Sequence, residues 1–311
     1  MKKISTLLGL AVACACVLFS CKKNDLPKRL CQIKTSDRYG PWYGGVFAYE
    51  YDGQRLLTDF SYGYPTNTHF YYIVYDSKKR PSVITPSDYS YKYKLYYEHD
   101  LVTRIDVVDG ITVVQQAFLT YDHLGRLIEK RGLNAVYPVE RWEYDGFSCN
   151  PKKRLFYRIV SAARSNAADK PFWTTSLLPE MLSQSPLSAS IPMARVEDEQ
   201  LDLEIYHEYR YDNKINPQST LINFTLNPLF YGIDQGVGQF DPIPENNIIS
   251  AKYFGKYEGG YFNYMEATIT YQYDGLYPLR EDWKRTYHFT SGGPDNVADY
   301  YTNYTYDCVN R

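Results

Sequence analysis

A short motif, Tyr-Asp, recurs through the chain at nearly constant spacing, and it constrains the fold more than any other feature of the sequence. The dipeptide occurs seven times, and an eighth, degenerate copy reads Tyr97-Glu98-His99-Asp100. Counted on the aspartate, the first five copies lie at positions 52, 76, 100, 122 and 145, so the steps are 24, 24, 22 and 23 residues. A period of this length indicates that one structural unit is repeated along the chain.

Each copy of the motif ends an alternating stretch, such as Tyr91-Lys92-Tyr93-Lys94-Leu95. A period of two places aromatic rings on one face and charged groups on the other, which is typical of a strand buried on one side. The aspartate then begins a turn, often with Gly or Asn close behind, because these residues tolerate the backbone angles of a tight turn. A basic and an apolar residue usually start the return strand, as in Arg126-Leu127. Each unit is therefore predicted to be a β-hairpin.

These hairpins predict an all-β fold, an antiparallel meander that forms a curved sheet or open barrel with long irregular loops. The 34 tyrosines are expected to supply the aromatic inner face. One strand per 10–12 residues gives at most about 18–20 strands, each of about five or six residues. Residues 30–311 are predicted to form a single tyrosine-rich domain with an irregular insertion at about 161–200. Two packed β domains divided within that insertion are the alternative.

Two resemblances follow from these motifs. The run Tyr121-Asp122-His123-Leu124-Gly125-Arg126-Leu127 resembles the YDxxGRL core of the YD repeat of RHS-type and teneurin proteins, whose repeats wind into a β-shell. The motifs at 212–217, 245–248, 271–278 and 304–308 resemble, in their order, those of uncharacterised tyrosine-rich lipoproteins of Bacteroidota-type bacteria. The second resemblance implies a location in the cell envelope and a β fold, and it implies no activity.

The first 20 residues are predicted to be a lipoprotein signal peptide. Lys2 and Lys3 precede an apolar run at 7–19, which has the length of a signal-peptide core. Leu18-Phe19-Ser20-Cys21 resembles a lipobox, so we expect lipidation of Cys21 by acyl chains such as palmitate. Residues 21–29 would be the lipidated tether, and the lipid bilayer a partner through these chains. The expected location is the bacterial cell envelope at the outer membrane; an ordinary secretory signal is the alternative.

Composition and motifs argue against several functional classes. A net charge of −2 gives no reason to expect nucleic acid as a partner. The chain contains no G-x-S-x-G, P-loop, H-E-x-x-H or C-x-x-C motif, and its five histidines are scattered. We therefore predict no catalytic residue, no metal ligand and no cofactor, and do not expect an enzyme. Glu140 and Glu143 are three residues apart on a strand, so they should face opposite sides.

Three cysteines lie beyond the lipidated one. Cys31 begins the first expected strand and Cys308 ends the last, so a rolled sheet would bring them together as a candidate disulfide. Cys149, after a turn, is then the expected unpaired thiol.

Five aromatic residues in irregular stretches are the candidate ligand-binding residues, because strand packing does not explain them: Trp42, Tyr43, Trp173, Phe230 and Tyr231. The alternative is that these rings only anchor their loops to the sheet. The predicted function is a non-enzymatic binding or assembly module for a glycan or protein partner. A carrier of lipid or another apolar ligand in a curved sheet is the alternative, and a carboxylate-dependent glycoside hydrolase is a third, less favoured one.

Overall fold

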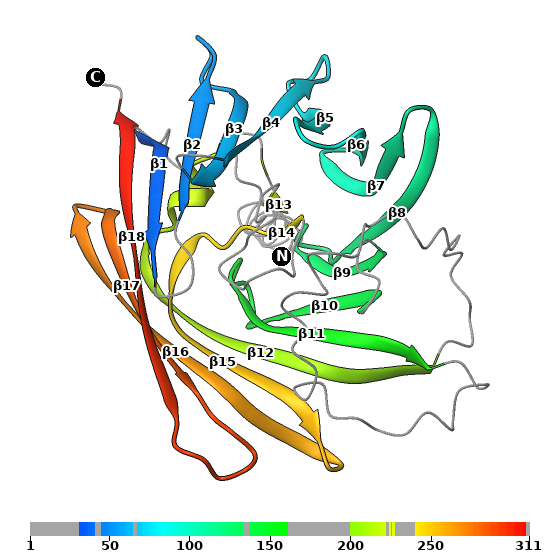
Figure 1. Cartoon of the computed structure of the whole chain (residues 1–311). Helices are drawn as coiled ribbons and strands as arrows, with labels where there is room; N and C mark the ends of the chain where they lie inside the picture. Colours follow the sequence, from blue (N-terminus) through cyan, green and yellow to red (C-terminus); the bar gives the residue numbers. More distant parts are fainter. Residues whose placement is uncertain are drawn as a thin grey trace, which may run out of the picture.

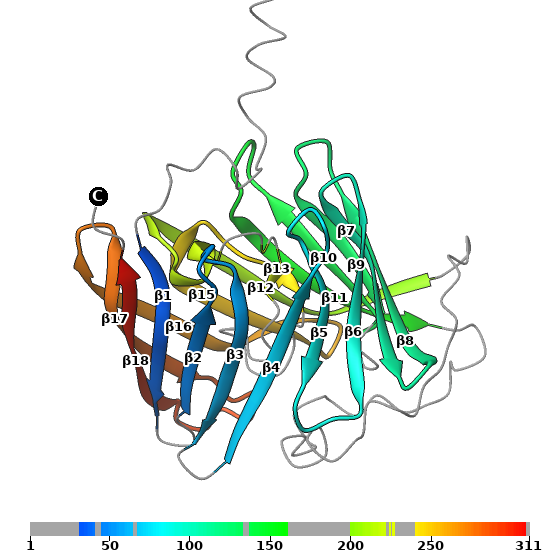
Figure 2. The ribbon, with the colours of Figure 1, turned by 90° about the horizontal axis from the view of Figure 1, so that it is seen from above.

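The chain forms a closed barrel of antiparallel strands (Figures 1 and 2). The computed structural model describes residues 31–40, 45–64, 67–132, 137–160, 200–221, 224, 226–227 and 240–308. Within these residues, strands β1–β12 and β15–β18 follow one another around the wall in chain order, and β1 pairs with β18. The predicted all-β meander is thus confirmed, although the sheet closes completely and is not an open barrel.

Thirteen of the sixteen described wall strands are longer than the five or six residues expected from the sequence, because most hairpin arms extend well beyond the alternating stretches; β5, β9 and β10 have six residues each. The first eight are β1 (Cys31–Tyr39), β2 (Gly45–Tyr51), β3 (Leu57–Tyr64), β4 (Asn67–Tyr75), β5 (Pro81–Pro86), β6 (Tyr91–Glu98), β7 (Leu101–Asp109) and β8 (Thr112–Tyr121). The other eight are β9 (Leu127–Gly132), β10 (Val139–Tyr144), β11 (Pro151–Val160), β12 (Gln200–Ile215), β15 (Asn246–Tyr257), β16 (Gly260–Asp274), β17 (Tyr277–Tyr287) and β18 (Asn296–Cys308).

Strands from both sides of the 161–199 segment belong to the same wall. β11 pairs with β12, for example through Phe156 and Ile205. At the seam of the barrel, a disulfide joins Cys31 of β1 to Cys308 of β18, with the Cα atoms 4.0 Å apart. Cys149 is also disulfide-bonded, so the expectation of an unpaired thiol at this position is wrong.

In seven of the eight copies, the tyrosine of the motif connects its hairpin to the preceding one. The Tyr121 hydroxyl donates to the main-chain carbonyl of Val102 at 2.8 Å, and the Tyr144 hydroxyl donates to that of Leu127 at 2.9 Å. Five more copies repeat this bond: Tyr51 to Ile33, Tyr75 to Leu57, Tyr97 to Pro81, Tyr211 to Pro151 and Tyr306 to Pro278. In the copy at Tyr273 the phenol reaches the Asp212 carboxylate instead, and Tyr271 donates to the Ile248 carbonyl.

A β-bulge explains why these tyrosines can reach across the wall. The register of pairing shifts immediately before Tyr121 and before Tyr144, and the same shift precedes the other motif tyrosines of β2, β4, β6, β12 and β16. A bulge bends its strand and redirects the next side chain. The hydroxyl is thereby aimed at the carbonyl of a neighbouring hairpin.

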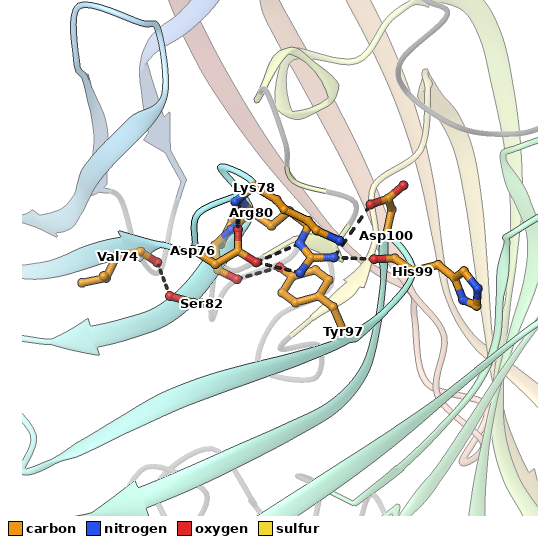
Figure 3. Close-up of polar contacts among 9 residues, drawn as sticks. Val74, Asp76, Lys78, Arg80, Ser82, Tyr97, His99 and Asp100 are labelled. Carbon is orange, nitrogen blue, oxygen red and sulfur yellow. Dashed lines mark hydrogen bonds and ion pairs between the residues drawn. The ribbon is translucent and has the colours of Figure 1, made fainter.

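The aspartate closes its own turn, and the arginine that follows connects this turn to the next one (Figure 3). Asp76 Oδ1 accepts the backbone N–H groups of Lys78 and Arg80 at 2.8 and 3.0 Å. Arg80 pairs with Asp76 Oδ2 at 2.7 Å and also donates to the carbonyl of His99 in the following turn. Its guanidinium lies 4.3 Å from the ring centre of Tyr97. Asp122 and Arg126 make the equivalent contacts two hairpins further along the wall.

The two faces of the wall differ in chemistry as predicted on most strands; β4 is an exception, because its exposed positions include Phe70, Tyr72 and Val74. Rings such as Tyr49, Phe60 and Tyr93 are buried on the inner face. The outer face carries charge in the middle of strands, where Lys252 pairs with Glu266 at 2.9 Å and Arg280 with Asp282 at 2.6 Å. Within the described residues no helix has the length and apolar character to cross a bilayer.

The tyrosine bond predicts a measurable loss of stability on removal of one hydroxyl. Tyr121→Phe should lower the free energy of unfolding by about 1–2 kcal/mol, because the Val102 carbonyl loses its partner in a partly buried position. Urea denaturation of the folded protein measures the loss. Tyr96→Phe is the matched control, since Tyr96 lies on the outer face and is 38% exposed; equal losses in the two variants would contradict the assignment.

The turn aspartates predict a loss of stability in acid. Burial alone would raise the pKa of Asp122, but the N–H groups of Arg126 and Leu124 and the Arg126 guanidinium outweigh it and lower the pKa. A depressed folded-state pKa stabilises the protein above the unfolded value of about 3.9, and this stabilisation is lost as the pH falls through the folded value. Asp122→Asn should therefore destabilise the barrel at pH 7, and the difference from wild type should shrink toward pH 2.

Urea denaturation at both pH values tests this dependence. The control is Asp145→Asn, because the Asp145–Lys152 pair is exposed and should contribute little at either pH. An Asp122→Asn deficit that is the same at pH 7 and pH 2 would disprove the role of the charge.

Candidate functional site in the barrel lumen

The connection between β12 and β15 turns into the lumen. It contains the 3-10 helix η3 (Pro217–Thr220) and a small sheet of β13 (Leu226–Asn227) and β14 (Asp241–Pro242), which both views place inside the ring of strands (Figures 1 and 2). We call the described parts of residues 216–245 the plug. The Asn216 N–H donates to the Glu245 carbonyl at 2.9 Å, and Asn246 Nδ2 donates to the Lys214 carbonyl at 2.9 Å. The plug therefore leaves and re-enters the wall at one place.

The plug fills part of the lumen with apolar side chains. Leu221, Phe224 and Leu226 are buried and pack in the same core as the inward rings of the wall. Phe240 is buried too, and its ring meets that of Tyr93 edge-on at 5.4 Å. Its φ of 62° is costly for a bulky residue, so packing must hold it there. A carrier of apolar cargo needs an open concave face, and here these side chains occupy that face.

Four charged side chains connect the plug to the wall in the buried interior. Lys130 of β9 lies 3.2 Å from Glu140 of β10 and 3.1 Å from Asp241 of β14, measured from Nζ to the carboxylate oxygens. Arg154 of β11 lies 2.5 Å from the Glu140 carboxylate and 2.8 Å from that of Asp241. Two cations and two anions thus alternate in a closed set, which we call the charge cluster. Lys130 and Glu140 are each only 2% exposed.

The pKa values of the two carboxylates in the charge cluster are shifted in opposite directions. Burial alone would raise the pKa of Glu140, but Lys130 and Arg154 outweigh it and lower the pKa. Burial raises the pKa of Asp241; the two cations oppose this rise, and the negative charge of Glu140 adds to it. Opposite shifts occur in acid–base pairs of enzymes. Here, however, both carboxylates are paired with both cations and Glu140 is almost inaccessible, so the arrangement fits an anchor for the plug better than a glycoside hydrolase site.

A second polar group lines a cavity between η3 and the seam of the barrel. Across β1, β18, β17 and β16 the inward positions Arg38, Thr302, Glu281 and Tyr271 follow one another as paired residues. The cavity is small, and part of it is open to solvent. Ser36, Tyr49, Tyr304 and the η3 residue Gln218 also line it. We call it the seam cavity.

Glu281 is the most unusual group of the seam cavity. It is only 2% exposed, and within the described residues its Oε1 atom has no hydrogen-bond partner. Arg38 lines the same cavity, yet in this part of the chain no ion pair joins it to Glu281. Arg38 and Glu281 therefore both line the cavity, from positions on either side of Thr302.

The residues singled out from the sequence fall mostly outside the described residues: Trp42, Tyr43, Trp173, Phe230, Tyr231 and the lipidation site Cys21. Their role stays a prediction. Glu140 and Glu143 do face opposite sides, Glu140 into the charge cluster and Glu143 outward. In the described ranges no three histidine, cysteine or acidic side chains are grouped so that they could hold a metal.

Sequence reasoning missed the charge cluster and the seam cavity, although a signal was present. Glu140 is in phase with Trp142 and Tyr144, so the alternation already places this carboxylate on the aromatic inner face. Glu281 is in the same way in phase with the inward Trp283. A charge at an inward position calls for a partner, and that partner cannot be named before the pairing of strands is known.

The charge cluster predicts a large effect of a single substitution. Lys130→Met should destabilise the barrel by about 3–5 kcal/mol, because it leaves an uncompensated negative charge in the interior. Lys252→Met is the matched control: the Lys252–Glu266 pair lies on the outer face with both side chains exposed, so its loss should cost less than about 1 kcal/mol. Urea denaturation compares the two, and similar losses would show that the buried cluster is no anchor.

No family model matches the chain, and no curated protein matches it. Among solved structures it is similar to a porin-like protein from Bacteroides uniformis ATCC 8492, at 12% identity and a TM-score of 0.43, covering 88% of this chain and 96% of that one. A weaker similarity, to TcdB2-TccC3 without its hypervariable C-terminal region, has 12% identity and a TM-score of 0.23 and covers 80% of this chain and 14% of that one. At these scores the similarities say nothing about a ligand or an activity.

Proposed function

We propose that this chain is a lipid-anchored protein of the bacterial cell envelope, built from YD-type hairpins, that acts as a non-enzymatic binding or assembly module for a glycan or protein partner. The observation that carries the proposal is the combination of a charged outer wall with a lumen occupied by the plug. Such a body is suited to lie in water as a stiff scaffold, held at the outer membrane through acyl chains on Cys21.

The outer wall supports the water-exposed part of the proposal. A barrel that crosses a membrane presents an apolar band to lipid, and a lysine or arginine at the middle of that band costs about 2–4 kcal/mol. Here the ion pairs Lys252–Glu266 and Arg280–Asp282 lie at the middle of strands β15–β17. Glu129 and Arg141 form another pair at 2.8 Å on β9 and β10. These charges favour contact with water along β9, β10 and β15–β17.

The lumen supports the scaffold part of the proposal. Apolar plug residues and the charge cluster hold the plug to several wall strands at once, so the interior is suited to rigidity more than to transport. A rigid scaffold usually presents specificity through the loops that it holds in place. The proposed contact residues are accordingly the loop aromatics Trp42, Tyr43, Trp173, Phe230 and Tyr231.

The test begins by releasing the protein from the membrane. Cys21→Ser should move the protein from the membrane fraction to the soluble fraction, because no second anchor is expected. The released protein is then screened for binding to a panel of host and dietary glycans and to cell-envelope extracts. Trp42→Ala and Trp173→Ala should lower binding to the selected glycan or protein at least tenfold with the melting temperature nearly unchanged.

Tyr96→Phe serves as the control, since it alters an exposed ring on the outer wall and should leave binding as it is. A large fall in melting temperature with unchanged binding would show that the loop aromatics only anchor their loops. Step-like conductance in a planar bilayer would contradict the scaffold and favour a channel.

A further inference from the structure

The seam cavity brings two opposite charges together without letting them neutralise one another. Arg38 and Glu281 lie on either side of Thr302 in one row of paired inward residues. Both line the cavity, and within the described residues they form no ion pair with each other. This differs from the charge cluster, where every carboxylate lies within 3.2 Å of both cations.

A buried carboxylate with an unused oxygen is an expensive arrangement. Glu281 Oε1 has no hydrogen-bond partner within the described residues, and leaving a buried charged group unsatisfied costs more free energy than leaving a neutral one. The wall could have removed this cost with an apolar residue at position 281, as it does at the inward positions of Ala267 and Ile269. A donor from outside the wall is therefore expected opposite the Oε1 atom.

We propose that the seam cavity binds a small zwitterion of the α-amino acid class. The ammonium group donates to Glu281 Oε1, and the carboxylate accepts two N–H groups of Arg38, whose planar fork matches a carboxylate. The hydroxyls of Ser36, Thr302 and Tyr304 line the same space and complete the polar contacts. No covalent step is involved.

The charges of the cavity favour a zwitterion over other small ligands. A bare cation would be attracted by Glu281 but repelled by Arg38, and a bare anion would be attracted by Arg38 but repelled by Glu281. A neutral molecule would leave both charges unpaired. The phenol of Tyr271 is a neutral neighbour, because burial and the negative charge of Glu281 raise its pKa well above the ordinary value. The rings of Phe47 and Tyr49 and the side chain of Ile248 limit the space, so glycine and alanine are the expected sizes.

This site shares no residue with the proposed loop contacts. It lies inside the barrel at the seam and uses wall residues of β1, β17 and β18, whereas the proposed function uses loop aromatics. Either can fail without the other.

The experiment is isothermal titration of the folded, purified chain with glycine, L-alanine and D-alanine. Methylamine and acetate, which each carry one half of the zwitterion, are the control ligands. We expect saturable binding of at least one amino acid and at least tenfold weaker binding of either half alone. Glu281→Gln and Arg38→Gln should each weaken amino-acid binding at least tenfold. Arg280→Gln is the matched control, because Arg280 precedes Glu281 but faces outward, and it should bind like wild type.

Thr302→Val is a second variant that keeps both charges, and it should weaken binding severalfold even if a charge variant fails to fold. Circular dichroism establishes that each variant compared is folded. The proposal is overturned if none of the three amino acids binds, in which case the cavity holds ordered water only. It is equally overturned if methylamine or acetate binds as well as the amino acid, or if Thr302→Val and the folded charge variants bind like wild type.

Discussion

The hydrogen bond from the motif tyrosine to the carbonyl of the preceding hairpin is the interaction on which the barrel depends. A sheet that rolls into a large barrel must keep each hairpin at a fixed offset from the last, and backbone pairing alone specifies that offset weakly. Tyr121 and Tyr144 specify it twice, by a bulge that breaks the regular register and by a hydroxyl that reaches one chosen carbonyl. Repeated around the wall, the bond sets where each strand starts relative to its neighbour.

The turn chemistry extends this control to one rim of the barrel. Asp76 fixes its own turn, and Arg80 joins that turn to the next while covering the ring of Tyr97. The three residue types of the motif therefore connect successive hairpins. The tyrosine bonds to the preceding hairpin, the aspartate stabilises its own turn, and the arginine bonds to the following turn. The last strand continues this pattern, because Tyr306 bonds to the Pro278 carbonyl. The barrel is then closed by the pairing of β1 with β18 and by the disulfide between them.

Periodicity explains how much of this could be predicted. Alternation in Tyr91-Lys92-Tyr93-Lys94 predicts a strand and both of its faces, since that information is local. Closure is a property of all strands together, and no single stretch carries it. The sequence does not predict the plug, because Leu221 and Phe224 show no period that would place them inside the barrel. The partners Lys130 and Asp241 are 111 residues apart, so their contact follows from the topology and not from a motif.

The interior contains two sets of buried charges, the charge cluster and the seam cavity. They differ in whether the opposite charges are paired with each other. In the charge cluster, Lys130, Glu140, Arg154 and Asp241 satisfy one another, so the group is closed and contributes rigidity to the plug. In the seam cavity, Arg38 and Glu281 line the same space and form no ion pair within the described residues, so both charges are available to a ligand. Asp37 Oδ1 and Trp283 Nε1 also lack a hydrogen-bond partner within the described residues, but neither side chain lines the seam cavity. The pairing of β1 and β17 with β18 fixes Arg38 and Glu281 on either side of Thr302, so the wall itself holds these two charges apart.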